Sequence, residues 1–231
     1  PIADAGFKSF GQSYISPNIG WVLAAAAILF VLLMTFKNIK TAKEYGLGET
    51  NSTGEILKSL LPIGAIIGFI YVMNSYAGVP IPVLILLAVA LLGYFITNNT
   101  TFGRYLYAIG GNADAARLSG INNKLNILKV FAFLGALTGI ASIIFTARVG
   151  SASPDAGVLK ELDAIAACVI GGASLMGGRG TIFGACLGAL IMVSLDNGMS
   201  LLNVRDFMQE IIKGSILVAA VGLDMAGKRQ S

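Results

Sequence analysis

Histidine is absent from the 231 residues, and only 12% of them are charged. Without histidine the chain lacks the commonest general base and the commonest zinc ligand, which argues against most hydrolase mechanisms. Cysteine is scarce as well: Cys168 and Cys186 form no C-x-x-C pair, and we interpret them as small residues of apolar segments. A soluble domain carries about 25% charged residues, so the shortage of charge excludes an ordinary soluble protein.

Apolar residues and glycine take the place of the missing charge. The hydrophobic fraction is 55%, the mean hydropathy is +0.78, and there are 29 glycines. Small residues let transmembrane helices approach each other closely, so the glycine content fits a membrane protein. The net charge of +4 comes from basic residues that lie between apolar segments without stacking aromatics, which favours topology signals over nucleic-acid binding.

Six apolar segments are long enough to cross a membrane as helices, because a span needs roughly 17–25 residues. They are residues 19–36, 57–76, 79–97, 127–147, 181–201 and 207–223. Asp196, Glu210 and Lys213 lie near the ends of the last two, where long side chains can reach the interface. Residues 162–176 form a seventh candidate, which crosses if it extends through Gly177 and is otherwise a broken or re-entrant helix. The sequence predicts an all-α transmembrane bundle of six or seven spans.

The basic residues predict the orientation of the chain, since lysine and arginine accumulate in cytoplasmic loops. Residues 98–129 hold four basic residues against one acidic residue, and residues 37–58 hold four lysines against three glutamates. Both are expected in the cytoplasm, together with the basic pair 228–229. Residues 148–161 lack the bias and are expected outside. Alternation along the chain holds if 162–177 crosses, which gives seven spans, an external start and an internal finish.

The polar segment after the third span has the signals of a short helix. Gly110 and Gly111 are expected to form a turn, Asn112 is a good N-cap, and 113–119 favours a helix that Gly120 stops. No G-x-x-x-x-G-K-[ST] motif is present, which argues against an ATP site on this chain. The helix is therefore expected to dock onto something, and these residues alone leave open whether that is lipid headgroups or a protein.

The run from Gly103 to Ile121, G-R-Y-L-Y-A-I-G-G-N-x-x-A-A-R-L-S-G-I, resembles the cytoplasmic coupling loop of bacterial ABC permeases for ribose, xylose and related monosaccharides. Residues 162–184 resemble a second signature of that family, and the likeness covers about 79–224. The resemblance implies that the loop couples the permease to an ATPase. The coupling residues that it implies are Gly110, Gly111, Asn112, Ala115, Ala116, Arg117, Ser119 and Gly120.

The second signature contains a cluster of small residues, for which two interpretations remain open. Its members are Gly171, Gly172, Ser174, Gly177, Gly178 and Gly180. They can form a surface for close helix packing, or they can break the helix and expose backbone dipoles or a hinge along a translocation path. Substrate-binding residues are not assigned, and Asp163, Phe102, Tyr105 and Tyr107 are given no substrate contact.

The resemblance implies the permease subunit of an ATP-driven importer that moves a monosaccharide, xylose or another pentose, across the bacterial inner membrane. It implies no enzyme activity and no cofactor on this chain, since ATP and Mg²⁺ would bind to a separate ATPase subunit. The other expected partners are a periplasmic sugar-binding protein and a second permease copy, with no nucleic acid. The alternatives are a permease for branched-chain amino acids or nucleosides, an ion-coupled secondary transporter, against which the sparse intramembrane charge argues, and a non-transporting scaffold.

We expect residues 1–231 to form a single transmembrane permease domain. The chain begins at Pro1 rather than methionine and has fewer predicted spans than the family it resembles. The sequence is therefore expected to be the carboxyl-terminal portion of a longer permease.

Overall fold

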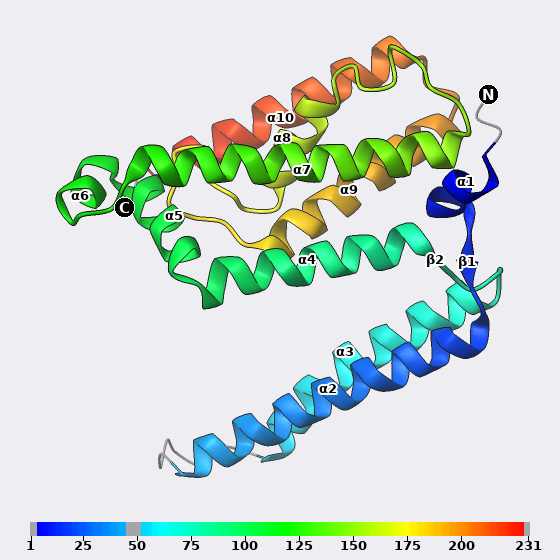
Figure 1. The fold of residues 1–231 in the computed structure, drawn as a ribbon, viewed down its shortest axis with the longest axis horizontal. Coiled ribbons are helices and arrows are strands. Elements are labelled where there is room, and N and C mark those ends of the chain that lie inside the picture. Colours follow the sequence, from blue (N-terminus) through cyan, green and yellow to red (C-terminus); the bar gives the residue numbers. More distant parts are fainter. Residues whose placement is uncertain (1–3, 45–51, 229–231) are drawn as a thin grey trace. The chain divides into compact units, whose positions relative to one another are not determined.

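The structure is a computed structural model, and it describes residues 4–44 and 52–228. It is 78% helical with almost no strand, which confirms the all-α class (Figure 1). The helices are α1 (Ala5–Gln12), α2 (Pro17–Glu44), α3 (Ser52–Asn74), α4 (Ile81–Asn99), α5 (Thr101–Gly111), α6 (Ala113–Leu118), α7 (Asn123–Val149), α8 (Lys160–Ile170), α9 (Ile182–Leu201) and α10 (Asp206–Lys228).

Three of the described helices are long and apolar enough to cross a membrane by length and composition: α4, α7 and α9. Shorter apolar stretches occupy Pro17–Leu33 of α2 and Leu60–Asn74 of α3. The side chains of α4 and α7 are largely exposed in the chain, as expected for helices that face lipid. The membrane-spanning character predicted from the sequence is confirmed.

The helices form two compact units. The first consists of the described residues of Pro1–Ile85 together with Ile143–Gly150. In it α2 and α3 run side by side (Figure 1), and Ala24, Ile70 and Val79 form a small buried cluster. Tyr14–Ile15 (β1) pairs antiparallel with Val79–Pro80 (β2).

The expected loop over 37–58 is wrong where the structure describes it. Helix α2 continues to Glu44 and α3 begins at Ser52, while residues 45–51 lie outside the described chain. The sequence signal failed here because lysine and glutamate are polar but still form helices well.

The second unit, Leu86–Ser142 with Ser151–Ser231 as far as described, holds the broken helix and its neighbours. Ala166 and Ala167 of α8 are buried against Met192 of α9. Glycines make this approach possible: a Cβ at Gly188 would collide with the carbonyl oxygen of Ala167, and one at Gly171 with that of Gly184. The packing interpretation of Gly171 thus has direct contacts behind it.

The seventh predicted span is helical over only part of its length. Helix α8 has 11 residues, about 16 Å at 1.5 Å per residue, which is too short for a hydrocarbon core of about 30 Å. It ends in a Schellman motif, in which the amide of Gly172 donates to the carbonyl of Val169 and that of Ala173 to Cys168. Gly172 has φ +86°, a backbone conformation that favours glycine.

The chain nevertheless runs the length of its neighbour α10. Val158 and Asp206 line one cavity, and at the far end Ser174 Oγ donates to Asp224, at 3.1 Å. From Asp206 to Asp224 helix α10 rises about 27 Å, close to the thickness of a hydrocarbon core. The sequence left a broken helix and a re-entrant helix as alternatives to a continuous span. The structure has the broken helix, with non-helical chain on both sides of α8.

Candidate functional site

The short predicted helix is present as α6, and its cap is the predicted one. Asn112 Oδ1 accepts hydrogen bonds from the amides of Asp114 and Ala115, at 3.1 and 3.0 Å. The helix ends at Leu118, and Gly120 follows with φ +83°. Asn112 thus fills the N-cap role expected of it.

The exposed side of α6 is polar. The side chains of Asp114 and Arg117 are 88% and 73% exposed and lie 3.8 Å apart, whereas Ala116 is buried. A solvent-exposed ion pair at that distance contributes little stability. Substitutions of Arg117 can therefore test docking without unfolding the helix.

The expected turn at Gly110 and Gly111 is wrong, because both residues belong to the end of a helix that the sequence did not lead us to expect. Helix α5 begins after Thr100, whose hydroxyl oxygen accepts from the amide of Gly103 at 3.2 Å. That threonine was the available signal, as a good N-cap residue. Most of the predicted polar loop is therefore two consecutive helices joined at Asn112.

The end of α5 lies against the glycine-rich segment that follows α8. A Cβ on Gly110 would lie 2.5 Å from the amide nitrogen of Gly178, and one on Gly177 would collide with the carbonyl oxygen of Gly110. The hydroxyl of Tyr107 donates to the carbonyl of Gly180, at 2.9 Å. We call this contact between α5 and residues 177–180 the glycine junction. In Figure 1 the yellow segment after α8 passes beside α5 before α9 begins.

The glycine junction brings together the two sequence signatures, which lie far apart in the chain. Gly177 and Gly178 have φ angles of +87° and +76°, so side chains are disfavoured there by both backbone conformation and space. Gly111 differs from Gly110, because a Cβ built on it meets no atom within 4 Å. The predicted coupling residues Gly110 and Gly111 thus both lie beside the glycine segment, since a Cβ on Gly178 would lie 3.0 Å from the Cα of Gly111, but only at Gly110 does an added Cβ point into that segment.

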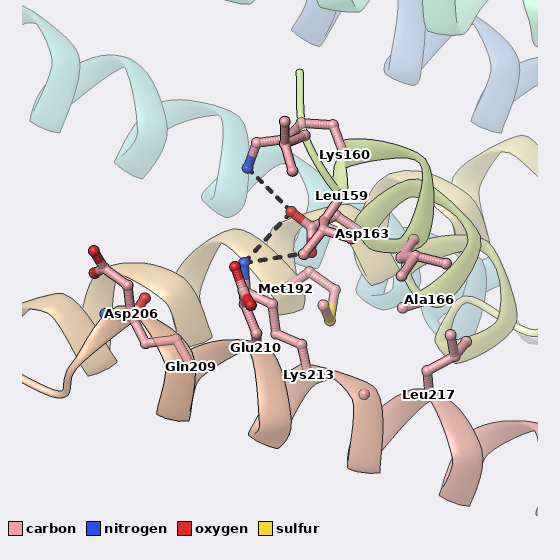
Figure 2. Close-up of a pocket in the computed structure, with 13 residues that line it drawn as sticks. Leu159, Lys160, Asp163, Ala166, Met192, Asp206, Gln209, Glu210, Lys213 and Leu217 are labelled. Carbon is pink, nitrogen blue, oxygen red and sulfur yellow. Dashed lines mark hydrogen bonds and ion pairs between the residues drawn. The ribbon is translucent and has the colours of Figure 1, made fainter. Parts of the chain in front are cut away.

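A second site lies in the same unit, where charged side chains of α8, α9 and α10 meet. Lys213 Nζ is 2.9 Å from Asp196 Oδ1 and 3.3 Å from Asp163 Oδ1, and Lys160 Nζ is 3.0 Å from Asp163 Oδ2. The side chains of Lys213, Asp163 and Asp196 are only 20%, 21% and 29% exposed. We call these four residues the charge cluster, and Figure 2 shows three of them, Lys160, Asp163 and Lys213.

The charge cluster corrects one expectation. Asp196 and Lys213 were expected to reach toward the membrane interface, but the structure pairs them with each other. Charges in apolar segments are costly unless they are paired, so the presence of both signs in neighbouring segments was the signal that sequence reasoning overlooked. Because the cluster contains its own counterions, it is not a row of free carboxylates of the kind that a proton relay needs.

The charge cluster borders a cavity of about 250 Å³. Figure 2 shows Lys160 and Asp163 of α8 facing Lys213 of α10, with Glu210 and Asp206 along the same helix. Apolar side chains complete the wall, namely Leu162, Ala166, Met192 and Leu217. No group of three or more metal-ligating side chains with metal-site geometry occurs in the described part of the chain.

Apolar helices, a broken crossing segment and a charge cluster within the bundle define a polytopic integral membrane protein. The chain belongs to the family described as the permease component of the branched-chain amino acid transport system, which matches residues 16–221. It is thus a multi-pass protein of the bacterial inner membrane, as the sequence predicted. Its relatives are permeases, the transport components of importers, rather than enzymes.

Characterised relatives match nearly the whole chain. The xylose transport system permease protein of Haemophilus influenzae is 47% identical over 220 residues, covering 95% of this chain and 59% of the relative. The corresponding protein of Escherichia coli K12 is 45% identical over 227 residues, covering 98% of this chain and 58% of the relative. The ribose import permease protein of the same strain is 49% identical over 148 residues, covering 64% and 46%. No solved structure matches the chain significantly.

Proposed function

We propose that this chain is the part of an ABC importer's permease through which a monosaccharide, xylose in the first place, enters the bacterial cell. The permeases that it resembles are named for xylose, ribose and allose transport. The xylose permeases match over almost all of the chain, whereas the ribose and allose permeases match about two thirds of it. Since the chain spans less than three fifths of the xylose relatives, the activity of the whole protein is part of the proposal.

The observation that carries the mechanism is the glycine junction. Helix α6 has an exposed polar side, which faces the cytoplasm in this proposal, and α5, which precedes it, contacts residues 177–180 through backbone atoms. An ATPase that docks on α6 and closes on ATP would move α5, and α5 would move residues 177–180, which follow the end of the broken helix. The importer thereby alternates between outward and inward access through a conformational change, with no covalent chemistry on this chain.

ATP and Mg²⁺ bind to the separate ATPase subunit in this proposal, and a periplasmic binding protein delivers the sugar. A second permease copy, identical or homologous, completes the pathway. The coupling residues on this side are those of α5 and α6 and their connection. They are Gly110, Gly111, Asn112, Ala115, Ala116, Arg117, Ser119 and Gly120.

The rival functions differ in substrate or in energy source. A branched-chain amino acid or nucleoside permease would share this fold, but the sugar permeases match with 45–49% identity. An ion-coupled transporter would need a cation site with unneutralised acidic groups inside the bundle, whereas the half-buried Asp163 and Asp196 share Lys213. Asp206 and Glu210, which form no salt bridge among the described residues, are exposed. The sugar importer is therefore the function that the observations support best.

Reconstitution of the complete transporter in liposomes tests this function. Xylose uptake is measured with ATP, with a non-hydrolysable ATP analogue, and with an ion gradient alone. We expect uptake only with hydrolysable ATP and binding protein, and stronger competition from ribose than from leucine. Uptake driven by the gradient alone would overturn the mechanism, and ATP-driven uptake of leucine but not xylose would overturn the substrate class.

A further inference from the structure

We propose that the cavity beside the charge cluster is a binding site for the transported sugar, at which carboxylates accept hydrogen bonds from the hydroxyl groups of an uncharged monosaccharide. The inference rests on the proposed function, and it assigns substrate contacts to Asp163, Asp206 and Glu210. The cavity lies where the non-helical chain enters α8 and α10 begins, within one compact unit.

The size of the cavity fits a single sugar ring. About 250 Å³ corresponds to about eight water molecules at ~30 Å³ each, which is room for one monosaccharide ring. One wall is apolar and includes Met192 and Leu217. A sugar has an apolar C–H face and a hydroxyl edge, so a cavity with one apolar wall and several convergent polar groups suits it.

The charges favour a neutral donor of hydrogen bonds. Ionised carboxylates only accept hydrogen bonds, and sugar hydroxyls can donate to them. Among the residues that the structure describes, neither Asp206 nor Glu210 forms a salt bridge, so both carboxylates are available at the cavity. Acidic groups outnumber basic ones by one along the wall, which disfavours the carboxylate of an amino acid.

Lys213 has a positioning role in this site. Its ammonium group has three donors, and they face both oxygens of Asp163 and one oxygen of Asp196. With its donors engaged, Lys213 fixes the direction of the Asp163 carboxylate rather than contacting the sugar itself. Because Asp163 is in the first turn of α8, a sugar bound there also contacts the helix from which the chain leads, through residues 171–176, to the glycine junction.

Protection of an engineered cysteine tests the site directly. In the complete transporter, with all native cysteines replaced, including Cys168 and Cys186, Gly214→Cys places a thiol at the cavity wall. Gly222→Cys on the same helix is the matched control, because a Cβ at either position meets nothing within 4 Å and Gly222 is not part of the wall. The rate of modification by a small water-soluble thiosulfonate is then measured with xylose, leucine or NaCl.

Xylose at about ten times its half-saturating concentration should slow modification of Gly214→Cys about tenfold, by simple occupancy. It should leave Gly222→Cys unchanged, and leucine and NaCl should protect neither. Asp163→Asn should abolish the protection, while Glu161→Gln, which removes a carboxylate of the same helix turn that is not part of the wall, should keep it.

Equal labelling of Gly214→Cys with and without xylose, or protection by NaCl instead, would overturn the sugar site, and the second result would indicate a cation site. Failure of this proposal is distinguishable from failure of the proposed function. ATP-driven xylose uptake without protection removes only the site, whereas loss of ATP-driven uptake in the unaltered transporter removes the function.

Discussion

The substitution Gly110→Ala, which adds one methyl group, should uncouple ATP hydrolysis from sugar uptake. A Cβ at this position would lie 2.5 Å from the amide nitrogen and 3.2 Å from the Cα of Gly178, whereas ordinary contacts begin near 3.4 Å. The neighbour is backbone rather than a flexible side chain, so α5 and residues 177–180 must separate by almost 1 Å, measured along the shorter contact. Overpacking of this kind costs about 1–3 kcal/mol.

The same free energy sets the size of the functional effect. We take the glycine junction to be tight in the conformation that couples the permease to the ATPase. A cost of about 1–3 kcal/mol then lowers the population of that conformation roughly 5- to 150-fold. Gly110→Ala should therefore lower sugar uptake per ATP hydrolysed by at least about fivefold. Gly111→Ala is the matched control, since a Cβ there meets nothing within 4 Å.

The assay measures uptake and hydrolysis in the same liposomes, with the amount of inserted permease determined for each variant. A lower ratio for Gly110→Ala at normal insertion, together with an unchanged ratio for Gly111→Ala, supports a tight glycine junction. Equal ratios in both variants would refute the reasoning, because the collision between the added methyl group and Gly178 would then have no consequence for coupling.

Three further predictions concern the same two sites. Arg117→Glu should uncouple hydrolysis from uptake by reversing the charge on the exposed side of α6. The amount of permease in the membrane should stay normal, because the exposed pair with Asp114 contributes no more than about 1 kcal/mol. Unchanged coupling would remove α6 from the docking role. Asn112→Ala should destabilise α6 by about 1 kcal/mol and speed amide exchange at Asp114 and Ala115. Asn112→Asp should preserve the cap, so the amide exchange rates should stay those of the unaltered protein. Lys213→Met should lower the melting temperature in detergent more than Asp163→Asn, since it leaves two carboxylates without their shared cation; the reverse order would show that Lys213 is not the centre of the charge cluster.

These predictions separate the two sites experimentally. The glycine junction is tested by the ratio of uptake to hydrolysis, which depends on how subunits move together. The charge cluster is tested by stability and by sugar protection, which depend on binding and folding. A variant at one site that changes only the other site's readout would show that the two are coupled through α8, which begins at the cavity and leads into the glycine segment.

Local features of the chain were predictable from the sequence because they depend on neighbours within a few residues. Composition alone identified a membrane protein, since each span must satisfy its backbone polar groups internally and expose apolar side chains. Asn112, a few good helix formers and Gly120 were sufficient to predict α6. The break after α8 was among the alternatives for the same reason, because glycines in a short run favour a helix end.

The tertiary structure decided what depends on residues far apart in the chain. Tyr107 and Gly180 are 73 positions apart, and neither helical periodicity nor a capping pattern relates them. Asp196 and Lys213 were each noticed near a helix end, yet only the fold, in which α9 and α10 both pack against α8, pairs them. The sequence by itself thus determined that this is a helical membrane protein with a short helix capped by Asn112. Only the folded chain showed that this region adjoins the glycine break, because backbone contacts between glycines have no side chain through which a sequence pattern could reveal them.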